Sequence, residues 1–301
     1  SIVLFNTVFT LSGGFDIDKY IEKFLNVDFV ISTADYFQYQ FEKSEGDLTE
    51  SFIQAVRQNE NFDDGGRLYT SRLLEENFST DHAAFTNYNK DENGNPFVDI
   101  YGADDFVLNT MEAVEGTIDL EQLKTGKYIL LSVECTDDGT VIDNPNIHVG
   151  DTIQLNHIRK DGLSDTIGES YEFTIMAKVR KNENTTTTRN TGASRLYLPT
   201  EIYLPLCDQP HLVNFPFNVK PGTEPAMEEF LKSYIDSVEP SMDFESKSTY
   251  VSPFEGLTSL IITIGGSLSI IIGIIGIANF VNSVLTSVIT RKKEFAMLQS
   301  I

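Results

Sequence analysis

Histidines, cysteines and paired carboxylates are the residues that most often do chemistry in proteins, and here they lie far apart in the sequence. The four histidines are His82, His148, His157 and His211. They form no HExxH or His-x-His pair, and two cysteines are too few for a zinc site by themselves. The sequence before the apolar tail also lacks the glycine-rich phosphate loops and the GxSxG nucleophile motif. We therefore expect no catalytic centre, no metal, no cofactor and no enzyme activity in this chain.

Two kinds of carboxylate-rich segment could bind calcium. Asp91–Gly102 begins like an EF-hand loop, but Pro96 stands where that loop needs Gly, and Gly102 stands where it needs a bidentate Glu. A turn at Asn93-Gly94 is the better prediction. The acidic pairs fall in predicted loops, where solvated surface is the simpler interpretation and calcium binding is the alternative. These pairs are Asp63-Asp64, Asp104-Asp105 and Asp137-Asp138.

The composition is that of a folded, acidic protein, with 41% hydrophobic residues, 22% charged residues and a net charge of −23. This charge argues against nucleic acid as a partner and against lying flat on an anionic lipid surface. It favours a cationic partner through steering, although the acids can equally serve solubility alone. Cys135 and Cys207 do not make a disulfide framework. They form either one bridge outside the cytoplasm or two buried thiols.

The most informative feature is a long apolar run near the C-terminus. From Gly256 to Thr290 there is no charged residue, and the centre of the run is Leu260–Val284. About 20 apolar residues suffice to cross a bilayer, so a transmembrane helix is a better prediction than a buried soluble helix. Because the whole run would be about 50 Å long as a helix, we expect it to tilt or to project beyond the bilayer as a stalk.

The flanks of this run predict its orientation. Arg291, Lys292 and Lys293 follow it directly, whereas acidic residues precede it. Basic flanks stay in the cytoplasm, so the residues before about 256 should be extracytoplasmic and the C-terminus cytoplasmic, in a bacterial cell membrane. Ser1–Leu11 is apolar, too short to span and without an initiator Met. We interpret it as the outer end of a preceding transmembrane helix, and the chain as a fragment of a longer protein.

Small and polar residues follow one another through the apolar run at steps of three or four. This stripe consists of Gly265, Ser269, Gly273, Gly276, Asn279, Ser283 and Ser287. The spacing puts all seven on one helical face, where small residues allow another helix to approach and Asn or Ser can hydrogen-bond across the contact. We expect this face to pack on other helices of the same chain or of a second copy. The alternative is that small residues are simply common in membrane helices.

The segment between the two apolar ends mixes helical and strand patterns. Helices are predicted over 16–25, from Thr49 as N-cap, near 104–113 and over 224–238. Strands are predicted over 28–33, 67–71, 128–133, 152–157, 171–179, 213–219 and 242–248. The pairs Asn93-Gly94, Asp138-Gly139 and Asp161-Gly162 suit hairpin turns, and the polar stretch 181–194 predicts a mobile loop. An α/β start, a β-rich middle and an α/β end indicate one subdomain built from both ends of the segment, with a second inserted.

The tail IGGSLSIIIGIIGIANFVNSVLTSVITRKKEFAMLQSI, matching over Gly265–Ile301, resembles the second transmembrane helix of FtsX-like ABC-transporter permeases. In that family a helix bearing Gly and Asn ends in a basic segment with Glu, leading towards the ATPase. The preceding segment resembles the MacB-type extracytoplasmic domain of such permeases. That second resemblance is carried by VDIYGAD (98–104), VEG (114–116), GKYILL (126–131), VGDT (149–152) and LYLP (196–199).

The resemblance implies an α+β fold with a two-lobed extracytoplasmic domain and one long transmembrane helix. The preceding helix would end at 1–11, and the α/β lobe would take 12–72 and 212–252. The inserted β-rich lobe would take 73–211, the stalk and transmembrane helix 253–290, and the cytoplasmic start 291–301. Arg291, Lys292, Lys293 and Glu294 would form the cytoplasmic anchor and coupling segment. The chain has no Walker motif, so a separate cytoplasmic ABC ATPase would be its partner, with a second permease copy in a dimer.

The function implied is that of a permease subunit whose outer domain relays ATP-driven motion. It would export or extract an amphiphile, such as an antimicrobial peptide, a lipid-linked molecule or a lipoprotein, with membrane lipid around the helix. The acidic surface makes a cationic peptide the natural substrate. The alternative is an FtsX-like regulator of an extracytoplasmic cell-wall hydrolase that transports nothing. A third reading is the outer domain of a single-pass receptor.

Overall fold

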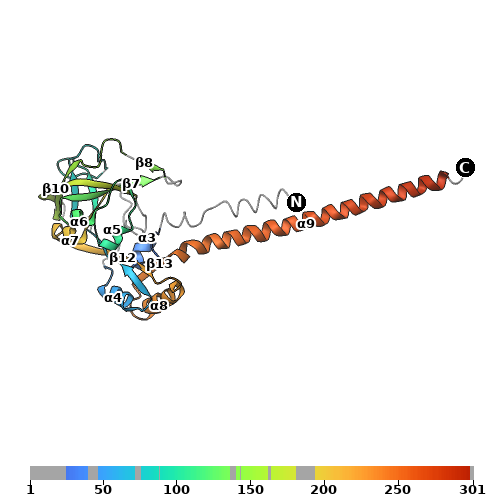
Figure 1. Ribbon diagram of the computed structural model, residues 1–301, viewed down its shortest axis with the longest axis horizontal. Coiled ribbons are helices and arrows are strands. Elements are labelled where there is room, and N and C mark those ends of the chain that lie inside the picture. Colours follow the sequence, from blue (N-terminus) through green and yellow to red (C-terminus); the bar gives the residue numbers. More distant parts are fainter. Residues whose placement is uncertain are drawn as a thin grey trace. The chain divides into compact units, whose positions relative to one another are not determined.

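The computed structural model of the 301-residue chain describes residues 25–39, 47–71, 76–87, 89–135, 140–142, 144–161, 164–180 and 194–298. They form an α+β fold, as expected, with a β-rich head up to residue 248 and the long helix α9, Lys247–Leu298 (Figure 1). Head and helix belong to different compact units.

Thirteen strands of the head join one hydrogen-bonded network. The strands of the first half are β1 (Phe29–Thr33), β2 (Phe62–Gly65), β3 (Leu68–Ser71), β4 (Glu76–Thr80), β5 (Phe97–Ala103) and β6 (Ala113–Gly116). Those of the second half are β7 (Tyr128–Cys135), β8 (Val141–Ile142), β9 (Thr152–Asp161), β10 (Ser164–Arg180), β11 (Arg195–Pro199), β12 (Pro210–Val219) and β13 (Met242–Ser246).

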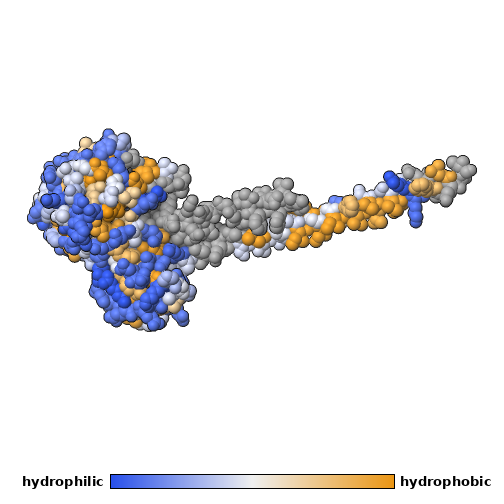
Figure 2. Space-filling model, in the orientation of Figure 1, coloured by the Kyte–Doolittle hydropathy of each residue, from blue (hydrophilic) through white to orange (hydrophobic). Residues whose placement is uncertain are grey.

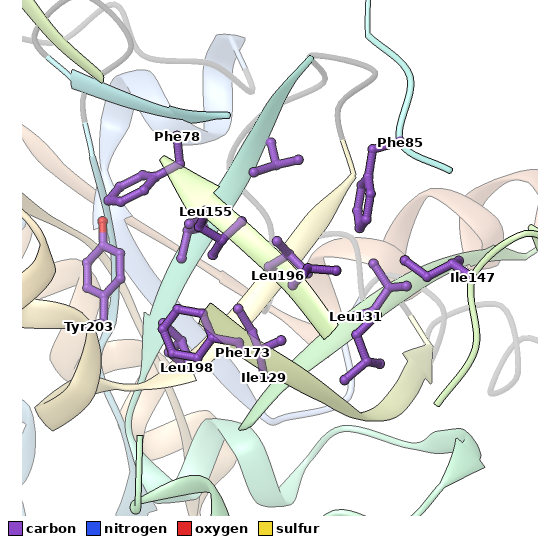
Figure 3. Packing of buried hydrophobic residues seen from close by; sticks show 14 of the residues in the cluster. Phe78, Phe85, Ile129, Leu131, Ile147, Leu155, Phe173, Leu196, Leu198 and Tyr203 are labelled. Atoms are coloured by element: carbon purple, nitrogen blue, oxygen red, sulfur yellow. The ribbon is translucent and has the colours of Figure 1, made fainter. Parts of the chain in front are cut away.

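Six of these strands close into a ring. Their order is β5-β4-β9-β10-β7-β11, and β11 pairs again with β5 in parallel. Each strand of the ring sends alternate apolar side chains inward, as the two-residue period of a strand requires. The buried interior includes Phe78, Leu155, Phe173, Leu196 and Leu198 (Figure 3).

The interior of the ring is closed on one side by the segment after β11. Helix α7 (Thr200–Tyr203) and the 3-10 turn η1 (Leu204–Leu206) place Tyr203 against β5. A Cβ added at Gly102 would lie 2.4 Å from the Tyr203 ring, so only glycine permits this approach. A second apolar cluster covers the outside of the ring, under α5 (Asp105–Asn109) and α6 (Leu120–Leu123).

A second sheet continues from the ring through β3, in the order β3-β12-β1-β13, with β2 also paired to β12. Helices α4 (Glu50–Gln58) and α8 (Glu224–Ser237) contribute to its core, and Figure 1 shows both beside β12 and β13. Phe29 stacks on Phe217 across β1 and β12 within this core. The short helix α3 (Ala34–Tyr39) follows β1.

Helix α9 is one continuous helix of 52 residues that begins directly after β13. Its stretch Ile262–Lys292 is long and apolar enough to cross a membrane. Large apolar side chains along it are exposed, and Figure 2 shows the hydrophobic surface ending in a hydrophilic patch near the C-terminus. Ile264, Ile270, Ile277 and Phe280 are each at least 65% exposed. Water would disfavour such a surface, whereas hydrocarbon would not.

Most of the elements predicted from the sequence are confirmed. The strands over 28–33, 128–133, 152–157 and 213–219 and the helix over 224–238 appear with small shifts of their ends. The helix predicted near 104–113 is wrong in its second half, because α5 ends at Asn109 and residues from Ala113 pair with β10. Apart from Leu25 and Ser194, the helix predicted over 16–25 and the loop predicted over 181–194 lie outside the described residues, as do residues 1–11. The limits proposed for the domains remain predictions.

Candidate functional site

The stripe predicted from the sequence lies entirely within α9. All seven residues from Gly265 to Ser287 are helical, so their spacing of three and four does place them along one face. A Cβ added at Gly273 or Gly276 would meet no atom within 4 Å. The backbone is therefore open to close approach at these two positions. That another helix packs here remains a prediction.

The end of this face towards Arg291 is more polar than the stripe alone suggested. A shallow groove there is lined by Asn279, Asn282, Ser283, Thr286, Ser287, Thr290 and Arg291. The hydroxyls of Thr286 and Thr290 donate to the carbonyl oxygens of Asn282 and Thr286, at 2.8 and 2.9 Å. These two hydroxyls already donate within the helix, whereas the amides of Asn279 and Asn282 carry donors and acceptors that can bond to a neighbour.

The basic segment that begins at Arg291 follows directly after the apolar stretch of α9. Arg291 and Lys292 are exposed on α9, and Lys293 and Glu294 continue the same helix. The helix thus runs without a break from the head to the predicted anchor and coupling residues. The role of these four residues remains a prediction.

A second cluster, which the sequence did not reveal, lies at one end of the six-stranded ring. Glu76 and the interior residue Phe78 are two positions apart on β4, so their side chains lie on the same face of the strand. On β9, His157 pairs with Phe78 and Arg159 with Glu76. These side chains continue the inward-facing rows of β4 and β9, and the His157 ring stacks on Phe78 at 5.0 Å. We call Glu76, His157, Arg159, Glu169 and Asp208 the ring-end cluster.

Glu76 is the most constrained member of the ring-end cluster. Its side chain is 3% exposed, and its Oε2 lies 2.6 Å from Nε2 of His157. The backbone N–H groups of Asp208 and Gln209 donate to the same carboxylate, at 3.0 and 3.2 Å. Burial raises the pKa of Glu76, but these hydrogen bonds outweigh burial and leave the pKa below its ordinary value. Glu76 is therefore a buried carboxylate that stays ionised.

Arg159 joins the two exposed carboxylates of the ring-end cluster. Its guanidinium donates to Asp208 through Nε and to Glu169 through Nη2, the second at 3.1 Å. The hydrogen bond from Arg159 is the main cause that lowers the pKa of Asp208. Glu169 also lies near the histidine, with 4.0 Å between its Oε2 and Nδ1 of His157. Nδ1 itself is buried and has no hydrogen-bond partner among the described residues.

Cys207 precedes Asp208 and lies beside Glu76. It is a free and buried thiol, so the bridge to Cys135, one of the two alternatives left open by the sequence, is not formed. Burial is the largest cause that raises its pKa well above the ordinary value. The negative charge of Glu76 also raises the pKa of this thiol. Cys207 is therefore held as a neutral thiol against the ring-end cluster, which does not favour reaction as a nucleophile.

The EF-hand-like segment forms a turn, as predicted. The Asp91 carboxylate accepts hydrogen bonds from Ser79, from the N–H groups of Asn93 and Asn95, and from the Asn95 amide. Gly94 adopts φ 83°, which suits glycine in such a turn. Because the carboxylate already accepts hydrogen bonds from its own turn and from Ser79 of β4, calcium binding is not supported.

The acidic pairs have three different outcomes. Asp63 and Asp64 are exposed but lie in strand β2 and not in a loop. Asp104 accepts from the backbone N–H of Arg67 and from the hydroxyl of Thr200, so it ties α5 to β3 and α7. Asp137-Asp138 lies outside the described residues.

Comparisons with known proteins give only distant similarity. No family model and no curated protein matches the sequence. Among solved structures, the periplasmic region of MacB from Actinobacillus actinomycetemcomitans aligns with a TM-score of 0.46 and 10% identity, covering 78% of this chain and 95% of that one. The extracellular domain of the noncanonic ABC-type transporter YknZ from Gram-positive bacteria aligns with a TM-score of 0.39 and 9% identity, covering 72% and 100%. At these values the likeness carries no argument about function.

Proposed function

We propose that this chain is part of a permease subunit of a mechanically coupled ABC transporter. In this role the head is extracytoplasmic, α9 crosses the membrane, and the C-terminus meets a separate cytoplasmic ATPase. The transported molecule is an amphiphile, for which a cationic peptide, a lipid-linked molecule or a lipoprotein is the chemical class. The chain itself carries no catalytic centre in this proposal.

The observation that carries the proposal is the continuity of α9. It starts at Lys247, directly after β13, and runs through the apolar stretch into Arg291–Glu294. Its 52 residues correspond to about 78 Å, far more than the about 30 Å that a bilayer core requires. A single helix that is longer than the bilayer is thick can transmit a displacement from one side of the membrane to the other. A flexible linker cannot do so.

The resemblance of the tail to FtsX-like permeases gives the proposal its specific class. The same residues give the proposal its physical parts: a small-residue face for neighbouring helices and a basic segment with Glu294 for the cytoplasmic side. The acidic composition supports a cationic substrate through long-range attraction.

The test is the turnover of the ATPase that co-purifies with the intact protein in lipid nanodiscs. Gly273→Leu should block close helix packing, and Glu294→Lys should reverse a charge in the coupling segment. Coupling through packed elements is worth about 0.5–2 kcal/mol, so we expect turnover to fall roughly 2- to 30-fold in each variant. The matched control is Ile274→Phe, which adds bulk on the opposite face of α9.

Two results would contradict the proposal. One is the absence of any co-purifying ATPase, and the other is equal turnover in Gly273→Leu, Glu294→Lys and the control. Capture of a cell-wall hydrolase by the head, with unchanged tolerance of cationic peptides on deletion of the gene, would favour the regulator of a hydrolase instead.

A further inference from the structure

We propose that the ring-end cluster is a binding site for a divalent transition metal of the zinc type. The ligands are Nε2 of His157 and the carboxylates of Glu76 and Asp208. One ligand atom from each of these three residues lies within 4.8 Å of the other two. The site is independent of the proposed transport role, because it uses only residues of the ring and of the segment after η1.

The donor set matches zinc better than the hard cations. One imidazole nitrogen and two carboxylate oxygens suit Zn²⁺, whereas Ca²⁺ and Mg²⁺ prefer oxygen alone. Zinc bonds to nitrogen and oxygen are about 2.0–2.2 Å, so two ligand atoms of a tetrahedral ion stand about 3.4 Å apart. Asp208 is half exposed and can close the small remaining distance. Three protein ligands leave a fourth position for water.

The unpartnered nitrogen of His157 is the second observation that points to a metal. With the proton on Nε2, that nitrogen donates to Glu76, and the lone pair of Nδ1 faces the carboxylate of Glu169. This arrangement leaves a buried acceptor opposite a negative charge, which is unfavourable. When a metal takes Nε2, the proton moves to Nδ1 and can be donated to Glu169. A carboxylate behind a ligating histidine is the usual second partner in zinc sites.

The balance of charge supports the same conclusion. Glu76, Asp208 and Glu169 bring three carboxylates to the cluster, and Arg159 is the cation that pairs with two of them. A divalent ion would compensate this charge more completely, but it has to displace the Arg159 guanidinium from Asp208. Arg159 should therefore weaken metal binding, and its removal should strengthen it.

The experiment uses the full chain in detergent, freed of metal, and titrates it with Zn²⁺ by calorimetry and with Co²⁺ by visible absorption. We expect one site per chain and the d–d bands of a four- or five-coordinate Co²⁺. Asp208→Asn, which alters an exposed side chain, should lower affinity at least tenfold, and Glu169→Gln should lower it about tenfold. Arg159→Gln should raise affinity.

His157→Gln should abolish the Co²⁺ bands, and His148→Gln, an exposed histidine elsewhere in the head, is the matched control. Because His157 is buried, Asp208→Asn keeps the test valid if His157→Gln fails to fold. Equal Zn²⁺ affinity in the wild type and Asp208→Asn would overturn the proposal. So would the absence of Co²⁺ d–d bands from the wild type.

Discussion

At the scale of single residues, the buried carboxylate of Glu76 couples the ring to the chain that follows η1. It accepts from His157 of β9 and from two backbone N–H groups at 208 and 209. A carboxylate held by several donors is stable in the ionised form, and the lowered pKa expresses this. Its protonation should therefore loosen the contact between the ring and residues 207–209.

The pH dependence of stability follows from this lowered pKa. The contribution of Glu76 should be fully present above its ordinary pKa of 4.5 and should be lost as pH falls further, through the lower pKa of the folded protein. Glu76→Gln should cost about 1–3 kcal/mol at neutral pH, because buried donors lose their partner. It should also flatten the decline of stability in acid.

Urea unfolding of the full chain at a series of pH values measures both effects. Glu172→Gln, an exposed residue of β10, is the control and should leave the curve unchanged. An acid decline in Glu76→Gln as steep as in the wild type would mean that other groups govern the pH dependence.

The ring-end cluster was not predicted from the sequence. We expected no metal because the histidines form no ligand motif along the chain. The proposed ligands Glu76 and His157, however, are 81 residues apart in the sequence. Only the antiparallel pairing of β4 with β9 brings them together. A polar residue two positions from a buried Phe on a strand was the one signal in the sequence that could have pointed to the cluster.

At the scale of elements, local signals predicted well where they were strong. Thr49 was predicted as a helix N-cap, and its Oγ1 does accept from the N–H of Phe52 at 3.2 Å. Phe52, Ile53 and Val56 are the buried face of α4. The helix predicted near 104–113 is wrong in its second half because residues 113–116 pair with the distant strand β10. A local sequence pattern does not contain such a pairing.

The cap of α4 gives a second prediction about stability. Thr49→Ala should lower the free energy of unfolding by about 1 kcal/mol, because the N–H of Phe52 loses its acceptor and the hydroxyl no longer reaches Glu239. Thr49→Ser keeps the oxygen and should recover most of the loss. The two variants are compared by urea unfolding. Equal stability of Ala and Ser at this position would show that the cap contributes nothing.

At the scale of the whole molecule, the proposed function requires that the head and the C-terminal end of α9 lie on opposite sides of a membrane. The basic segment 291–293 and the exposed apolar surface of Ile262–Lys292 support this orientation. Of the two natural thiols, Cys207 is buried, and Cys135 is replaced by Ser so that it adds no background to a thiol-labelling experiment.

We predict that a membrane-impermeant thiol reagent applied to intact cells labels Asp63→Cys, an exposed head position, and spares Lys292→Cys. Permeabilised cells should show labelling of both positions. In Gram-negative cells the outer membrane is made permeable first. The reverse pattern, with Lys292→Cys labelled from outside, would rule out the proposed orientation and with it the transport role.

The sequence by itself determined the parts whose physics is local. Apolar length without charge predicted the long helix, side-chain periodicity predicted most strands, and glycine with asparagine predicted the turn at Asn93-Gly94. The tertiary structure alone decided the closure of the ring by the parallel pair β5–β11, and the meeting of Glu76, His157 and Asp208 at its end. Strand pairing joins residues far apart in the chain, and no local pattern records which strands will pair.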